Sequence, residues 1–182
     1  LGIMSELRTN KIYPRDGLPV GASGGIIQIV EKIDASTNTT TSTSWTNSGV
    51  EGLNISITPT SASNKILMMV TMQLECGSGS NTGSIIFARD PAGTPVYFAN
   101  SGVAAGIGVG NNSTGVSKLF LSQGYSGLNG QTTSHFGVDS PGTTSSVTYG
   151  VLWGVNGGNA YYNRGAGGYN GASSIILMEV SG

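Results

Sequence analysis

The chain contains 182 residues, of which only 9% are charged, and its formal net charge is −1 at pH 7. Typical globular proteins carry about 25% charged residues, and surfaces that bind nucleic acid need clustered Lys and Arg, so we predict no nucleic-acid partner. The single cysteine, Cys76, excludes an intrachain disulfide and is predicted to be a small core or strand-end residue.

The first 25 residues do not follow the pattern of the rest of the chain. They lack the ~15–20 consecutive apolar residues of a signal or membrane segment, and we predict no membrane insertion. Pro14 and Pro19 favour an extended backbone, and the Gly/Ser-rich stretch at 21–25 is typical of a flexible joint. We therefore divide the chain into an extended N-terminal docking arm with its joint, residues 1–25, and one domain, residues 26–182.

From residue 26 onward, apolar and polar residues alternate with the period of two that is typical of β-strands, and no long segment shows a helical period. Gly, Pro, Asn, Asp and Ser punctuate this alternation as turns. The predicted strands are 26–33, 53–58, 65–75, 84–89, 96–98, 117–122, 135–138, 146–153 and 173–180, with 37–44 as an exposed strand or loop and 154–172 as a loop. Short strands with polar, Gly-rich connections predict an all-β fold, an antiparallel β-sandwich of the jelly-roll type with an extended N-terminal arm.

Two of these strands carry apolar residues on both faces. In 65–75, Leu67 and Met69 add apolar side chains to the face opposite Ile66 and Met68, and 173–180 contains four apolar residues in a row. A strand that is apolar on both faces is usually covered on both sides. We therefore expect the last strand to lie centrally in its sheet and a neighbouring subunit to cover part of this region.

The search for catalytic groups gives no candidate. The nine acidic residues include no pair that stands out as the two carboxylates of a glycosidase, and Asp90 and Asp139 lie close to prolines as predicted turn formers. The single histidine, His135, has no nucleophile motif beside it. A threefold axis could gather three copies of His135 or of an acid around an ion, but one chain alone does not supply a zinc site. We predict no catalytic residues, no metal site, no cofactor and no enzyme activity.

The loop at 154–171 is the strongest candidate for binding. Aromatic rings stack on apolar faces, and amide and guanidinium groups form hydrogen bonds with hydroxyls, so such a surface suits a sugar or a protein. The alternative is that the tyrosines pack at a subunit interface or cap the end of the sandwich. The candidate residues are Trp153, Tyr161, Tyr162, Asn163, Arg164 and Tyr169.

Several short segments point to a family. They are SELRTNKI at 5–12, PRDG at 14–17, GGIIQ at 24–28, ITPTSASNKIL at 57–67, TYGV at 148–151 and SIILMEV at 174–180. Together they resemble tail-fibre-type structural proteins of marine tailed phages, cyanophages especially. The resemblance implies a component of the virion, on the tail or on the capsid surface, and a trimer of the C1q/TNF-like jelly-roll type.

From these patterns we expect a virion structural protein, a tail fibre or receptor-binding component, that forms a homotrimer and contacts a glycan or protein of the host surface. The alternatives are a decoration or head-fibre protein of the capsid and, from another class, a glycan-active enzyme. The arm would dock onto other virion proteins, although its basic residues could instead keep it solvated. The residues assigned to docking are Leu7, Arg8, Asn10, Lys11, Ile12 and Arg15.

Overall fold

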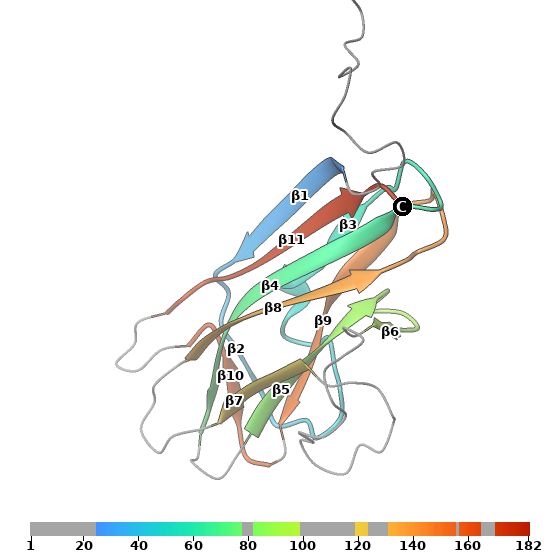
Figure 1. Cartoon of the computed structure of the whole chain (residues 1–182). Helices are drawn as coiled ribbons and strands as arrows, with labels where there is room; N and C mark the ends of the chain where they lie inside the picture. Colours follow the sequence, from blue (N-terminus) through green and yellow to red (C-terminus); the bar gives the residue numbers. More distant parts are fainter. Residues whose placement is uncertain (1–24, 78–81, 99–118, 124–130, 156, 165–169) are drawn as a thin grey trace, which may run out of the picture.

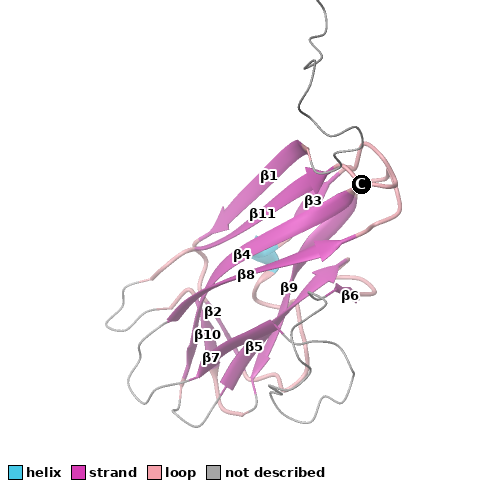
Figure 2. Ribbon diagram, in the orientation of Figure 1, coloured by secondary structure: helices cyan, strands magenta, loops and turns pink. Residues whose placement is uncertain are grey.

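The computed structural model describes residues 25–77, 82–98, 119–123, 131–155, 157–164 and 170–182. Over these residues the chain folds into two antiparallel sheets packed face to face (Figures 1 and 2). This arrangement confirms the predicted all-β sandwich. The predicted arm, with its docking residues, lies outside the described residues.

The first sheet contains the two ends of the domain. Its strands are β1 (Ile26–Asp34), β2 (Asn38–Thr40), β4 (Lys65–Cys76), β8 (Gln131–Asp139), β10 (Ala160–Tyr162) and β11 (Ser173–Val180). Their order is β1-β11-β4-β10-β2, with β8 on the other edge of β4. β11 therefore lies between β1 and β4, which confirms the prediction that the last strand is central.

The second sheet packs beneath the first. Its strands are β3 (Ile55–Ile57), β5 (Thr82–Arg89), β6 (Val96–Phe98), β7 (Leu119–Gln123) and β9 (Val147–Val155), and a 3-10 turn, η1 (Glu51–Leu53), precedes β3. The order is β3-β9-β5-β6, with β7 also paired to β5. Successive long strands β4, β5, β8, β9 and β11 thus alternate between the sheets, as in a double-sheet jelly roll.

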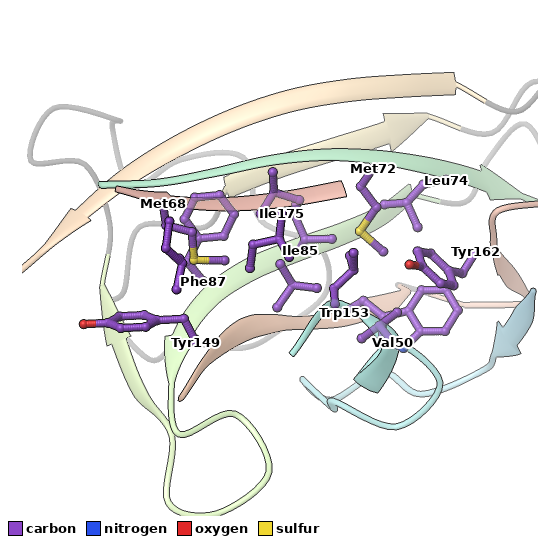
Figure 3. Close-up of a cluster of buried hydrophobic side chains, with 14 of the residues drawn as sticks. Val50, Met68, Met72, Leu74, Ile85, Phe87, Tyr149, Trp153, Tyr162 and Ile175 are labelled. Atoms are coloured by element: carbon purple, nitrogen blue, oxygen red, sulfur yellow. The ribbon is translucent and has the colours of Figure 1, made fainter. Parts of the chain in front are cut away.

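The core fills the space between the sheets, and Figure 3 shows its central side chains. Strand β4 alternates along its length, and its inward residues from Ile66 to Cys76 are all buried. The largest side chains with almost no exposure are Trp153, Tyr149, Tyr162 and Phe87. The burial of Cys76 agrees with the core position predicted for it.

Three strand predictions need correction. β10 lies within the segment 154–172 that was predicted to be a loop, and β8 begins at Gln131 rather than at His135. The predicted strand 53–58 is divided, because η1 ends at Leu53 and β3 begins only at Ile55. Each missed stretch is short or polar, so its pairing depends on a neighbouring strand rather than on its own apolar alternation.

The two ends of the sandwich are formed by different segments of the chain. At one end the Gly25 N–H donates to Ser181 Oγ and the Ser181 N–H donates to the Gly25 carbonyl, at 3.1 and 3.0 Å. At the other end the Gly77 N–H donates to the Asn159 carbonyl at 2.9 Å, beside β10. The 12 residues of β4 run between these ends and span about 40 Å at ~3.3 Å per residue. Gly25 and the β10 region therefore lie at opposite ends of the sandwich.

Candidate functional site

Three of the six residues predicted to bind a host surface are in the core, which corrects that part of the prediction. Trp153, Tyr162 and Asn163 have relative exposures of 1%, 0% and 0%. Figure 3 shows Trp153 and Tyr162 side by side, and their ring centroids are 6.2 Å apart in an edge-on arrangement. Trp153 Nε1 also donates to the Ser48 carbonyl at 2.8 Å. Trp153 of β9 and Tyr162 of β10 thus pack the two sheets against each other, and all three side chains are too buried to contact an external partner.

Asn163 is buried between three segments of the chain and forms hydrogen bonds with them. Its Nδ2 donates to the carbonyls of Asp34 and Ser36 at 2.8 and 3.0 Å, and its Oδ1 accepts from Ser173 Oγ at 2.6 Å. Its φ is 53°, a left-handed conformation that Asn tolerates better than most residues. Asn163 is therefore a structural residue that joins the β1–β2 connection to β11.

Tyr161 and Arg164 remain accessible, while Tyr169 lies outside the described residues. The Arg164 guanidinium carbon lies 4.3 Å from the centroid of the Tyr161 ring, a cation–π geometry. Tyr161 is the partner of Glu75 in the register of β10 and β4. Glu75 is only 2% exposed, and neither of its carboxylate oxygens has a hydrogen-bond partner in the described structure. Burial raises the pKa of Glu75, and the nearby Arg164 charge partly opposes that rise.

The opposite end of the first sheet contains a buried acid with full hydrogen bonding. Glu179 is 0% exposed and accepts from Asn64 Nδ2 at 2.6 Å, Gln28 Nε2 at 2.6 Å and the Thr60 N–H at 2.7 Å. Burial alone would raise the pKa of Glu179, but these hydrogen bonds outweigh it and lower the pKa to about 2. This carboxylate fixes the turn before β4 to β11 and β1, so its role is structural.

The outer face of the first sheet is apolar across its width. Residues directly opposite one another in paired strands point to the same face, and the register places two rows across β1, β11, β4 and β8. In these rows Ile29, Met69, Phe136 and Val138 are 54%, 41%, 56% and 42% exposed. We call this surface the apolar face; its members are Ile29, Leu67, Met69, Phe136, Val138, Ile176 and Met178.

The outer face of the second sheet carries a groove of about 500 Å³. Leu152 of β9 lines it together with two segments, the stretch from Trp45 to Glu51 and the stretch from Pro91 to Tyr97, which covers the turn after β5 and the start of β6. Trp45 packs on a small outer cluster of Ile86, Ala88 and Leu152. The lining residues are Trp45, Thr46, Asn47, Ser48, Glu51, Pro91, Ala92, Pro95, Tyr97 and Leu152.

A glycine in β9 allows the two borders to approach the sheet. A Cβ on Gly150 would meet Asn54 Oδ1 at 2.2 Å and Pro91 Cγ at 2.9 Å. Asn54 in turn exchanges two hydrogen bonds with Asn47, at 3.0 and 2.7 Å, and Asn47 Nδ2 also donates to the Val151 carbonyl at 2.8 Å. The groove is thus held by a fixed polar network on one side and by a proline-containing turn on the other.

Asp139 and Asp90, the two acids predicted to form turns, both have structural partners. Asp139, predicted to be a turn former, is the last residue of β8 and accepts from Tyr149 OH at 2.8 Å, with Arg89 Nη1 at 3.4 Å. Asp90, with a φ of 54°, accepts from the Thr94 N–H at 3.2 Å, as expected of a turn residue. Among the described residues, no three His, Cys, Asp or Glu side chains gather in a way that could hold a metal ion.

Sequence reasoning missed the groove and Glu75. Trp45 and Glu51 stand in a polar, non-alternating stretch, and Tyr97 in a strand of three residues, so no local pattern brings them together. In the part of the chain described here, no helix is long and apolar enough to cross a membrane. No known protein-family model matches the chain, and a search of curated proteins found no match.

Proposed function

We propose that this protein is a non-enzymatic structural subunit of a phage virion, a tail-fibre or receptor-binding component that assembles as a homotrimer. The apolar face is the observation that carries the proposal. Monomeric proteins rarely expose contiguous apolar patches of more than a few hundred Å². Obligate interfaces between identical subunits are more hydrophobic than the rest of the surface, and a second copy of this chain is the occupant that fits the apolar face best.

The charge pattern supports self-association over another partner. In the two rows that form the apolar face, Glu31 on the edge strand β1 is the charged residue, so copies related by symmetry would bring few like charges together. The low charge of the whole chain, 9%, agrees with a protein that keeps part of its surface inside an oligomer.

The two ends of the sandwich suit a subunit that is attached to the particle at one end and free at the other. The proposed arm, residues 1–25, ends at Gly25, which pairs with Ser181 at one end of the sandwich. Tyr161 and Arg164 lie toward the other end, near Gly77 and Asn159. In the proposal the arm docks onto other virion proteins and the sandwich projects from the particle toward the host surface.

Mass measurement in solution tests the assembly. We expect light scattering after size-exclusion chromatography to give three copies of the 18.5-kDa chain. The double substitution Met69→Lys and Phe136→Lys places two charges in one row of the apolar face, on the paired strands β4 and β8, and should give a folded monomer with an unchanged circular-dichroism spectrum. Val96→Lys is the matched control, because Val96 is 45% exposed but belongs to the second sheet, and it should leave the mass unchanged. A monomeric parent protein would overturn the assembly proposal.

A further inference from the structure

We infer that the groove on the second sheet is a saccharide-binding site that takes one pyranose ring of a neutral or amino sugar. The inference deepens the host-contact part of the proposed function and rests on it for the source of the ligand. Its location differs from the tyrosine-rich loop that the sequence favoured. The argument comes from the aromatic residues, the polar groups, the rigidity and the position of the groove.

The aromatic residues supply the surface on which sugar rings pack. Trp45 and Tyr97 come from the two segments that border the groove. Trp45 is half-buried against the outer cluster, so its ring is held in place, and Tyr97 is 37% exposed. The C–H face of a pyranose packs on such rings, and pockets of this size, about 500 Å³, fall within the range of small-ligand sites.

The polar groups that line the groove determine which ligand charge it accepts. Thr46 and Ser48 add hydroxyls, and Glu51 adds a carboxylate, the one charged group among the lining residues that the structure describes. Glu51 Oε2 accepts from the Gly49 N–H at 2.7 Å, which restricts the position of the carboxylate. Carboxylate oxygens accept hydrogen bonds from sugar hydroxyls or an ammonium group but repel anions. The groove therefore favours neutral and amino sugars over uronic acids.

The groove is built before any ligand arrives. The segment from Trp45 to Ser48 is fixed by backbone hydrogen bonds between Thr46 and Trp153 in both directions, at 3.1 and 2.9 Å. The Asn47–Asn54 amide pair and the Trp153 Nε1 bond to the Ser48 carbonyl add to this. A preformed site loses less conformational entropy on binding, so a shallow groove can hold a small sugar.

The position of the groove keeps it open in the proposed assembly. The apolar face belongs to the first sheet and the groove to the outer side of the second, with the core between them. Burying the apolar face in an oligomer would leave each groove on the outside. Several grooves on one particle would then raise the avidity for a repeated surface glycan well above the affinity of one site.

The fluorescence of the two tryptophans provides the test, because Trp153 is 1% exposed and Trp45 is in the groove. Acrylamide quenching of the full-length protein is measured in the presence of one sugar at a time: methyl glucoside, methyl galactoside, N-acetylglucosamine or glucuronic acid. Each sugar is added to about 50 mM, a concentration at which binding with a Kd on the order of 10 mM is detected. We expect at least one neutral sugar to protect Trp45 from quenching and glucuronic acid to give no protection. Trp45→Phe should abolish the change.

Two further variants separate binding from folding. Tyr97→Ala should weaken the affinity by about tenfold or more, and Glu51→Gln should let glucuronic acid bind at concentrations where the parent protein does not. Failure of all three neutral sugars to protect Trp45, protection by glucuronic acid in the parent protein, or a Trp45 that acrylamide does not reach would overturn the inference. These measurements need no virion and no particular oligomer. If they fail, the assembly proposal is unaffected. If the parent protein is a monomer, the inference of a saccharide-binding groove is unaffected.

Discussion

At the scale of single residues, two buried glutamates show how surroundings decide the state of a carboxylate. Glu179 and Glu75 are both almost fully buried. The hydrogen bonds to Glu179 lower its pKa, whereas burial raises the pKa of Glu75, whose carboxylate has no hydrogen-bond partner among the described residues. Folding therefore favours the charged form of Glu179 and the neutral form of Glu75.

Glu179→Gln is expected to destabilise the domain in a pH-dependent way. The pKa of Glu179 is about 2 in the folded protein, against an ordinary value of 4.5, so its contribution is complete above pH 4.5 and is lost as the pH falls towards 2. At pH 7 the variant should lose about 1.5–3 kcal/mol of unfolding free energy, as expected for hydrogen bonds to a charged group. Denaturant unfolding at several pH values measures this, with Glu31→Gln as an exposed control. A difference between parent and variant that stays constant down to pH 2 would contradict the assignment.

At the scale of elements, Gly150 is the residue of β9 on which the shape of the groove depends. Gly150→Ala would place a methyl group 2.2 Å from Asn54 Oδ1 and 2.9 Å from Pro91 Cγ, and both borders would have to shift. We expect a loss of about 1–3 kcal/mol in unfolding free energy, typical of overpacking, together with weaker protection of Trp45 by sugars. Thermal unfolding and quenching measure the two effects. Gly25→Ala is the control, because a Cβ there meets nothing within 4 Å; equal stability of both variants would refute the close contact.

Alternation predicted most strands because a half-buried strand must put every second residue inward. β4 and β11 follow this rule, and β1 and β9 were also predicted within a few residues. β10 could not be predicted, because its three residues lie among Gly, Asn and Tyr and pair with β4 and β2, which are remote in sequence. The local sequence pattern does not reveal a strand that forms only because neighbouring strands pair with it.

The candidate site was harder to predict than the fold. Trp153 shares the inward face of β9 with Val147, Tyr149 and Val151, so alternation alone already indicated its burial, and grouping it with the binding loop was an error. The groove gave no such signal, since Trp45 and Tyr97 meet only after β9 and β5 have paired. Residues that act together across a sheet are visible only in the folded chain.

At the scale of the whole molecule, the proposed tasks fall on different parts of the fold. The first sheet presents the apolar face, the second sheet carries the groove, and Gly25, from which the proposed docking arm would continue, lies at one end of the sandwich. A change on one outer face should leave the other undisturbed, because the core of the sandwich lies between the two faces. A docked, self-associating and sugar-binding subunit could therefore be tested one surface at a time.

Deleting residues 1–20 should separate docking from folding. The deletion leaves Gly25 in place, with its hydrogen bonds to Ser181 at 3.1 and 3.0 Å, so we expect the unfolding temperature and the oligomer mass to stay unchanged. Incorporation into phage particles, measured by immunoblotting of purified virions, should be abolished. The Met69→Lys, Phe136→Lys variant is the complementary control, because it should lose the oligomer while retaining the arm. Normal incorporation of the truncated protein would assign docking to the sandwich, and loss of the oligomer on truncation would make the arm part of the subunit interface.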